Sequence, residues 1–209
     1  MGRAEKLKAE RQAEIKLDFG CGKNVKAGFE GVDIRPFGQK HVVDLVKPES
    51  GSTHGDPYGT YYKKWPWKDD SVSEANASHF IEHLTGPERI HFVNELWRVL
   101  VPGGKCQVIT PHWNSCRAYG DLTHQWPPVS EFWFYYLSQE WRASNAPHNE
   151  GNGGYLPDLN FECTWGFSLH PLLQARNQEY QTHALTFWKE AAQDLMATMV
   201  KVVKPQVKK

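Results

Sequence analysis

The stretch that decides the fold is Leu17-Asp18-Phe19-Gly20-Cys21-Gly22, which is followed by an acidic residue in Gly31-Val32-Asp33-Ile34. A short apolar run that breaks into Gly-x-Gly predicts a buried parallel strand and a loop whose backbone approaches a ligand closely. An acidic residue at the end of the next strand is placed to accept hydrogen bonds from a ribose diol. The pattern therefore indicates a nucleoside-containing ligand.

The loop differs from a dinucleotide fingerprint, because Val25 stands where a third glycine would pack a helix beneath a pyrophosphate. It resembles motif I of the class I methyltransferases that use S-adenosylmethionine. In that family the glycine loop packs against the methionine part of the cofactor, and the following acidic residue binds the ribose. Alone, a Gly-x-Gly also fits a plain strand-ending turn.

Two later stretches extend the resemblance over residues 17 to 112. The segment from Asn94 to Gly104 is an amphipathic helix with a Pro-Gly-Gly stop, followed by a strand at Cys106 to Thr110, and it resembles the approach to strand five of the family. The segment from Glu74 to Leu84 is similar to strand four and the start of the next helix. The resemblance implies a compact type-11-like domain with an α/β, Rossmann-like fold and a mostly parallel sheet of about seven strands.

Length and composition bound the organisation. A chain of 209 residues holds one α/β domain with a core of its own. We expect an N-terminal helical extension over 1–16 and a single methyltransferase domain over 17–209, with insertions at 47–70 and 113–159. The insertions are rich in Trp, Tyr and Phe, which predicts an aromatic-walled cleft.

Charge and cysteine content narrow the partners and the compartment. Lys plus Arg equals Asp plus Glu, at 24 each, so the electrostatic footprint of a nucleic-acid binder is missing and nucleic acid is not favoured as a partner. Four scattered cysteines do not suggest a disulfide framework or a zinc site, and no apolar stretch approaches the roughly 20 residues of a membrane helix. We expect a cytoplasmic protein with a small-molecule substrate and no membrane association.

The spacing of the first three strands is unusually short. We expect strands at 15–19, 30–34, 41–46, 73–78 and 105–110. Only eight residues separate Gly22 from Gly31, and six separate Ile34 from His41, whereas a helical crossover needs about a dozen. The helices after strands one and two are therefore predicted to be shortened or lost. One sheet face would then be apolar and need a cover from the N-terminal helix, the C-terminal helix or a second copy, so a homodimer is one arrangement that the sequence allows.

The remaining elements are predicted from local patterns. A helix over Pro87 to Leu100 has Thr85 and Glu88 at capping-box spacing. A strand is expected over Phe161 to His170, and a helix from Leu172 to about Ala197. The last segment, Thr198 to Lys204, is ambiguous between a helix end and a final strand.

The resemblance also implies a cofactor site. Asp33, with Ile34 beside it, would bind the ribose, and Asp44 with Leu45 would contact the adenine, although Asp44 also fits a plain strand-end cap. Asp18 would order the glycine loop, whose backbone would approach the amino-acid moiety at Gly20, Cys21 and Gly22. Ser78 and His79 would line the methionine side.

Methyl transfer to a hydroxyl needs an aligned nucleophile, exclusion of water and a proton acceptor. The candidate bases are His112 after strand five, and Asp121 and His124 in Asp121-Leu122-Thr123-His124. A histidine suits this task because its reference pKa of about 6.5 is near working pH. Each of these residues is equally compatible with a structural role.

Two other functions stay open. His79, Glu82 and His83 form His-x-x-Glu-His, a zinc-hydrolase signature when it lies on one helix face. Here it spans a predicted strand end and helix start, so we assign no metal ligand. A non-catalytic cofactor-binding partner protein is the third interpretation. The methyl acceptor is left as a small molecule, sugar or nucleotide, methylated on oxygen or nitrogen.

Overall fold

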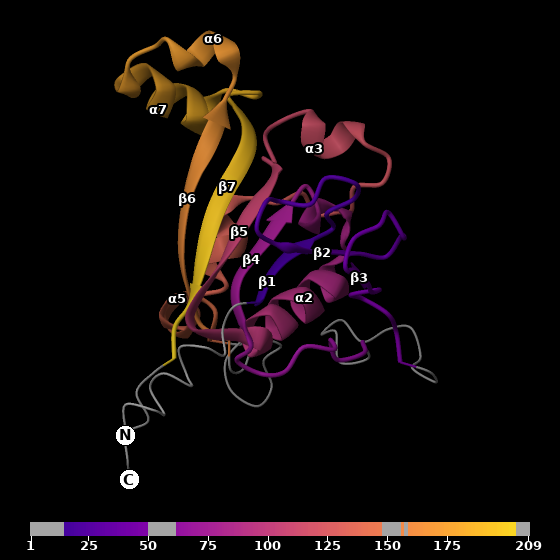
Figure 1. Cartoon of the computed structure of the whole chain (residues 1–209). Coiled ribbons are helices and arrows are strands. Elements are labelled where there is room, and N and C mark those ends of the chain that lie inside the picture. The colour runs from indigo at the N-terminus through magenta and orange to yellow at the C-terminus, as the bar shows by residue number, and fades with distance from the viewer. Residues whose placement is uncertain (1–14, 50–61, 148–155, 157–158, 204–209) are drawn as a thin grey trace.

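A seven-stranded sheet with the order β3-β2-β1-β4-β5-β7-β6 organises the chain (Figure 1). The computed structural model describes residues 15–49, 62–147, 156 and 159–203. The N-terminal extension expected over 1–16 lies outside these residues, apart from the start of the first strand. The strands are β1 (Ile15–Phe19), β2 (Glu30–Asp33), β3 (His41–Val42), β4 (Val72–Ser78), β5 (Leu100–Pro111), β6 (Phe161–Leu169) and β7 (Ala192–Lys201).

The strand directions place a binding crevice at the carboxyl ends of β1 and β4. The first five strands are parallel, and only β7 runs antiparallel, between β5 and β6. The chain moves outward from β1 to β2 and β3, and then returns to the other side of β1 at β4. Parallel sheets bind ligands at such a switch point, because the loops leaving the two strands diverge there. The predicted mostly parallel, Rossmann-like sheet is confirmed.

The first two crossovers contain no helix. Residues 20–29 join β1 to β2 through turns, one of which is closed by a hydrogen bond from the Phe29 amide to the Lys26 carbonyl at 3.0 Å. Residues 34–40 join β2 to β3 in the same manner. The predicted shortening of both crossovers is confirmed, and β3 itself is only two residues long instead of six.

One face of the sheet carries the hydrophobic core. The helix α2 (Gly86–Val99) lies across it, and the ring of Phe92 on α2 packs 5.5 Å from that of Phe19 on β1. Trp65 and Trp67 pack against Phe19 from the loop before β4, at centroid distances of 5.0 and 6.0 Å. Phe134 on α4 extends the layer by stacking on Trp165 of β6. The two short helices on this side are α4 (Glu131–Tyr135) and α5 (Gln139–Asn145).

The opposite face is polar at the sheet centre, which corrects the expectation of an apolar surface. Side chains alternate between faces along a strand, so Asp18 points away from Phe19. Asp18 accepts from the Asn76 amide at 2.7 Å, and Lys26 bonds Asn76 and Gln107 at 3.1 and 2.6 Å. In this polar ladder the side chains on the face are paired with one another by hydrogen bonds. The N-terminal segment proposed as its cover lies outside the described residues, and a second copy stays a prediction.

The helix α2 begins where the sequence predicts. The Thr85 amide donates to Glu88 at 2.7 Å, and the full capping box is present. The strand after it begins earlier than expected, at Leu100, because Pro102 and Gly103 sit inside β5. A register shift places Val72 opposite Leu100 but Glu74 opposite Lys105, and Gly103 takes φ +78°. The Pro-Gly-Gly element is thus a bulge within the strand.

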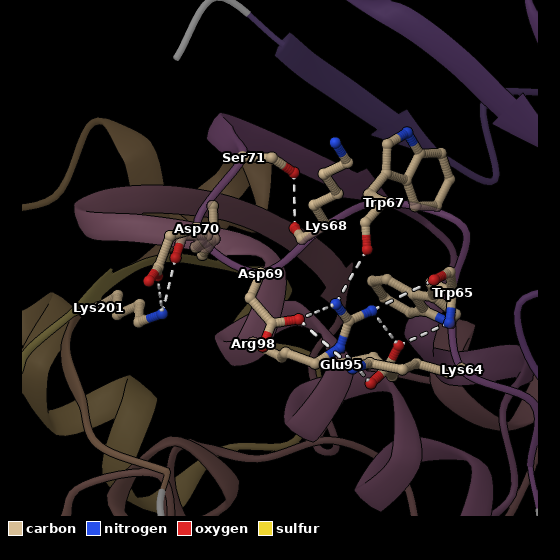
Figure 2. A network of polar contacts seen from close by, with 11 residues as sticks. Lys64, Trp65, Trp67, Lys68, Asp69, Asp70, Ser71, Glu95, Arg98 and Lys201 are labelled. Atoms are coloured by element: carbon tan, nitrogen blue, oxygen red, sulfur yellow. Dashed lines mark hydrogen bonds and ion pairs between the residues drawn. The ribbon is translucent and has the colours of Figure 1, made fainter. Parts of the chain in front are cut away.

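The other end of α2 anchors the loop before β4 (Figure 2). Arg98 makes two hydrogen bonds to Glu95, at 2.7 and 2.6 Å, and reaches the Trp67 carbonyl at 2.9 Å. The Trp65 amide donates to Glu95 at 2.6 Å. These contacts hold both tryptophans in the core, where they are 4% and 8% exposed. The tryptophans of the first insertion therefore do not wall a cleft, contrary to the prediction.

The C-terminal third corrects the predicted helix from Leu172 to about Ala197. Two short helices, α6 (Pro171–Gln174) and α7 (Gln178–Phe187), end well before that point, and Glu190 turns the chain with φ +66°. From Ala192 onward buried and less buried residues alternate, as in Leu195 and Met196. That period of two is typical of a strand, and β7 resolves the ambiguity at Thr198. Figure 1 shows α6 and α7 at the end of the β6–β7 hairpin, away from the sheet centre.

The helix α3 (Arg117–Gly120) follows β5, and a 3-10 turn η1 (Ile81–His83) follows β4. None of the helices within the described ranges is long and apolar enough to cross a membrane.

The aromatic core predicts the effect of Phe92→Ala. Phe92 is fully buried and contacts the rings of Phe19, Trp65 and Phe80. Its truncation should lower the free energy of unfolding by about 3–5 kcal/mol, measured by urea denaturation. Phe132→Ala is the control, because that ring is 63% exposed. Equal losses in the two variants would contradict the assigned core.

Candidate functional site

A cavity of about 470 Å³ lies at the carboxyl edge of the sheet. We call it the carboxyl-edge cavity. It stands at the switch point between β1 and β4, and its size is within the usual range of small-molecule sites. It is lined by Gly20, Asp33, Ile34, Arg35, Val43, Asp44, Leu45, Val46, His79, Phe80, His83, Leu84 and Thr123.

The glycine loop forms one wall because its backbone lies against an aromatic ring. Gly20 has φ +63°, and a Cβ built on it would stand 2.3 Å from Cδ2 of Phe80. Gly22 has φ +54° with open space around it. A side chain at Gly20 would clash with the Phe80 ring, and it would also strain the backbone, because residues with a Cβ disfavour this positive φ. The first glycine is thus required for close packing, and the second for backbone conformation.

Asp33 is the last residue of β2, and its carboxylate lies at the cavity and can accept further hydrogen bonds. One carboxylate oxygen accepts from the Gly22 amide at 2.9 Å, and the other accepts from the Arg35 amide at 2.9 Å. A carboxylate has about four lone-pair sites, so each oxygen can take a second donor. The two amides fix the carboxylate beside the glycine loop. This geometry suits a ligand that presents a pair of hydroxyl groups.

The adjacent wall is formed by Asp44 and Leu45. The Val46 amide donates to Asp44 at 3.1 Å, and the indole N–H of Trp65 donates to the Leu45 carbonyl at 2.8 Å. Ile34, also in the lining, is 60% exposed. The strand-end cap on Asp44 and its place in the lining coexist, so the two interpretations of this residue are compatible.

Four of the predicted cofactor residues are outside the lining, namely Asp18, Cys21, Gly22 and Ser78. Asp18 is 4% exposed and accepts from the Lys26 amide at 2.8 Å, so it holds the far end of the glycine loop. Cys21 packs toward Gly31, and burial raises the pKa of its thiol. Ser78 ends β4 one residue before the lining begins.

His79 stands at the end of β4 with φ +51°, an uncommon backbone conformation for a residue with a Cβ. Its Nδ1 lies 3.2 Å from the Glu82 carboxylate, and this contact raises the pKa of His79. The strained position turns the imidazole toward η1. His79 and Glu82 therefore form a hydrogen-bonded pair beside the cavity.

Of the three candidate bases, Asp121 and His124 flank Thr123 in the segment that reaches the cavity, although neither is itself in the lining. Thr123, which lines it, donates to Asp121 at 2.7 Å, and the His124 ring packs 4.8 Å from that of His83. His112 lies elsewhere: it is 2% exposed, and its Nε2 is 3.3 Å from the Glu131 carboxylate without an aligned hydrogen bond. His112, like Asp121 and His124, is outside the lining, so the identity of a base stays a prediction.

The aromatic residues of the second insertion wall cavities of their own and not the carboxyl-edge cavity. Phe132 and Trp133 line a separate cavity of about 330 Å³ between α2 and residues 127–137. Trp126 is 77% exposed to solvent. Phe80 is the only Phe, Tyr or Trp in the lining of the carboxyl-edge cavity, as far as the described residues go. Tyr61, from the first insertion, lies outside them.

Sequence reasoning missed Arg89, which holds the site together. Arg89 is 4% exposed on α2, and burial lowers its pKa to about 10. It donates to the carbonyls of Ile81 at 2.9 Å, Gln125 at 3.3 Å and Pro127 at 2.5 Å. The loop after β4 and the loop after β5 are thus joined. A helical arginine carries no sequence signal for such contacts, and Thr123 was missed for the same reason.

The fold can now be compared with solved structures. A SAM-dependent methyltransferase from Archaeoglobus fulgidus superposes with a TM-score of 0.56 at 15% identity, covering 95% of this chain and 90% of that one. The chain has the class I methyltransferase fold. Another from Methanosarcina mazei gives a TM-score of 0.51 at 12% identity, covering 98% and 99%. Geranyl diphosphate C-methyltransferase from Streptomyces coelicolor A3(2) superposes with a TM-score of 0.51 at 14% identity, covering 96% of this chain and 80% of that one.

No protein-family model and no curated protein sequence matches the chain. At identities of 12 to 15% the methyltransferase structures establish the fold alone. In this chain that fold is a sheet of order 3-2-1-4-5-7-6 with an antiparallel seventh strand. Its particular features are the helix-free crossovers after β1 and β2.

The packing of the glycine loop predicts the effect of Gly20→Ala. The new Cβ would clash with Phe80 and sit in a strained conformation, so the urea midpoint should fall markedly. Gly28→Ala is the matched control, because Gly28 has φ +82° but nothing within 4 Å of an added Cβ. Gly28→Ala should cost only the backbone strain, roughly 1–2 kcal/mol. Equal stability of the two variants would show that the loop does not pack on Phe80.

Proposed function

We propose that this protein is an S-adenosylmethionine-dependent methyltransferase acting on a small-molecule, sugar or nucleotide acceptor, by O- or N-methylation. The observation that carries the proposal is the placement of Asp33 and Gly20 in one cavity at the switch point of a class I methyltransferase sheet. The Asp33 carboxylate keeps lone pairs for a ribose diol. A glycine backbone faces the same space.

In this proposal each wall binds one part of the cofactor. Asp33 and Ile34 hold the ribose, and Asp44 with Leu45 contacts the adenine. The loop of Gly20, Cys21 and Gly22, ordered by Asp18, receives the amino-acid end. Ser78 and His79 bound the methionine side. The cofactor supplies an electrophilic methyl group on a sulfonium.

The proton acceptor is proposed to be His124 or Asp121. Both belong to the segment that contributes Thr123 to the cavity rim, and Asp121 Oδ2 lies 3.9 Å from His124 Nε2. The acceptor would enter from this rim. A cytoplasmic setting and a homodimer stay predictions.

Two alternatives make different predictions. The zinc-hydrolase motif of His79, Glu82 and His83 needs a helix, but these residues span a strand end and a single 3-10 turn. A non-catalytic cofactor-binding partner would have the same cavity and no turnover. Incubating the protein with S-adenosylmethionine and cell extract separates enzyme from binder. Release of S-adenosylhomocysteine above a protein-free control is the expected result, and binding without release would favour the non-catalytic partner.

The placement of the ribose predicts the effect of Asp33→Asn. The substitution keeps the side-chain shape but removes the charge, so S-adenosylhomocysteine affinity should fall about tenfold or more, measured by isothermal titration calorimetry. Glu140→Gln on α5 is the control, because Glu140 is exposed and outside the carboxyl-edge cavity. A melting temperature for each variant separates binding from folding. Unchanged affinity in Asp33→Asn would overturn the ribose placement.

A further inference from the structure

A cluster of three polar side chains lies at the rim of the carboxyl-edge cavity. Glu82 and His83 come from η1, and His124 comes from the loop after β5. One ligand atom from each of the three lies within 4.8 Å of the others. Three donors at this separation can share a single ion. Their types, two imidazole nitrogens and a carboxylate oxygen, are those of a transition-metal site with open positions.

Glu82 supplies an independent observation that points to a ligand. Its side chain is buried, with the residue 4% exposed, and one oxygen is 3.2 Å from His79 Nδ1. The other oxygen, Oε2, is fully buried and has no hydrogen-bond partner among the described residues. Most buried carboxylate oxygens are satisfied, because leaving one without a partner is costly. A cation bound by Oε2 would satisfy it.

The hydrogen bonds behind both histidines leave their Nε2 atoms free to bind a metal. Thr123 Oγ1 donates its only proton to Asp121 at 2.7 Å, so it must accept from Nδ1–H of His83 at 2.9 Å. Nδ1 of His124 lies 3.3 Å from the Ala118 carbonyl, which can only accept. Both rings therefore carry their proton on Nδ1. Metal-binding histidines are oriented in the same manner, by donating the other ring N–H to an oxygen.

The two segments that carry the cluster are fixed to each other. The Gln125 amide donates to the Glu82 carbonyl at 2.8 Å, so the backbone next to His124 is bonded to the backbone of Glu82. Arg89 bonds carbonyls on both sides of this contact. The donors are thus held on a rigid frame before any ion arrives, which limits the reorganisation needed for binding.

We propose that Glu82, His83 and His124 bind one divalent transition-metal cation, of the Zn²⁺, Co²⁺ or Mn²⁺ class, whose open positions take an oxygen of the methyl acceptor. The acceptor part rests on the proposed function, whereas cation binding does not. His83 and Thr123 line the carboxyl-edge cavity, so a bound ion faces the space assigned to the cofactor and acceptor. Two imidazole donors favour these ions over Mg²⁺ and Ca²⁺, which prefer oxygen ligands.

A cation here would serve methyl transfer to oxygen. Coordination lowers the pKa of a hydroxyl group, and its proton leaves to solvent, so neither His124 nor Asp121 is needed as the proton acceptor once a cation is bound. The oxygen then forms a bond with the methyl carbon, and the carbon–sulfur bond breaks with its electron pair on sulfur. The products are a methyl ether and S-adenosylhomocysteine. Thr123 and Asp121 act as positioning residues, because they orient His83 without contacting the ion.

The test is titration of the full-length protein, stripped of metal by a chelator, with ZnCl₂ in a calorimeter and with CoCl₂ in a visible spectrometer. One equivalent should bind, with cobalt absorption bands typical of nitrogen and oxygen ligands. His124→Ala and Glu82→Gln should each weaken Zn²⁺ binding by roughly tenfold or more. His183→Ala is the matched control, because this exposed histidine on α7 is outside the cluster. It should bind as the unaltered protein does.

Three results would overturn the proposal: no binding by the unaltered protein, equal affinity in all variants, or tighter binding of Mg²⁺ than of Zn²⁺. Circular dichroism checks that each variant is folded, and Thr123→Val offers a milder change that keeps both ligand rings. Titration with S-adenosylhomocysteine distinguishes the two failures. If S-adenosylhomocysteine binds but Zn²⁺ does not, only the cation site is wrong. If Zn²⁺ binds but S-adenosylhomocysteine does not, the proposed function is wrong.

Discussion

Two arginines on α2 hold loops that the sheet alone would leave unattached. Arg89, near the start of the helix, bonds carbonyls of the segments after β4 and β5. Arg98, in its last turn, bonds carbonyls in the loop before β4. A guanidinium has five donors in a fixed fork, so one side chain can satisfy several carbonyls at once. Because α2 is also the longest described helix, it defines both the core and the rim of the site.

The polar ladder across the other face explains how the fold tolerates helix-free crossovers. A parallel sheet is normally buried on both faces and rich in apolar residues there. In this chain Asp18, Asn76 and Gln107 occupy the central positions of β1, β4 and β5 instead, bridged by Lys26. Their hydrogen bonds replace the packing that two helices would otherwise supply. The ladder also supports the site, because Asp18 accepts a hydrogen bond from the Lys26 amide and so holds the far end of the glycine loop.

The parts of the fold that were predicted correctly depend on local chemistry. The Thr85–Glu88 capping box and the short spacing from Gly22 to Gly31 are readable within a few residues, and both are confirmed. The predicted helix reaching Ala197 was wrong because buried positions recur with a period of two in most of the ten-residue strand β7, and not with the period of a helix. A strand-end position places His112 at the sheet edge but does not give the direction of its side chain. The imidazole faces Glu131 and Phe167.

The sequence by itself determined the fold class, the shortened crossovers and the strand-end residues that line the carboxyl-edge cavity. These follow from glycine conformational freedom, strand periodicity and chain length, all of which act over short distances along the chain. Only the tertiary structure decided which polar residues meet. His124 lies beside His83 and Glu82 because β5 leaves the sheet next to β4 and Arg89 joins the two loops. Such contacts depend on packing between distant segments, and no local pattern encodes them.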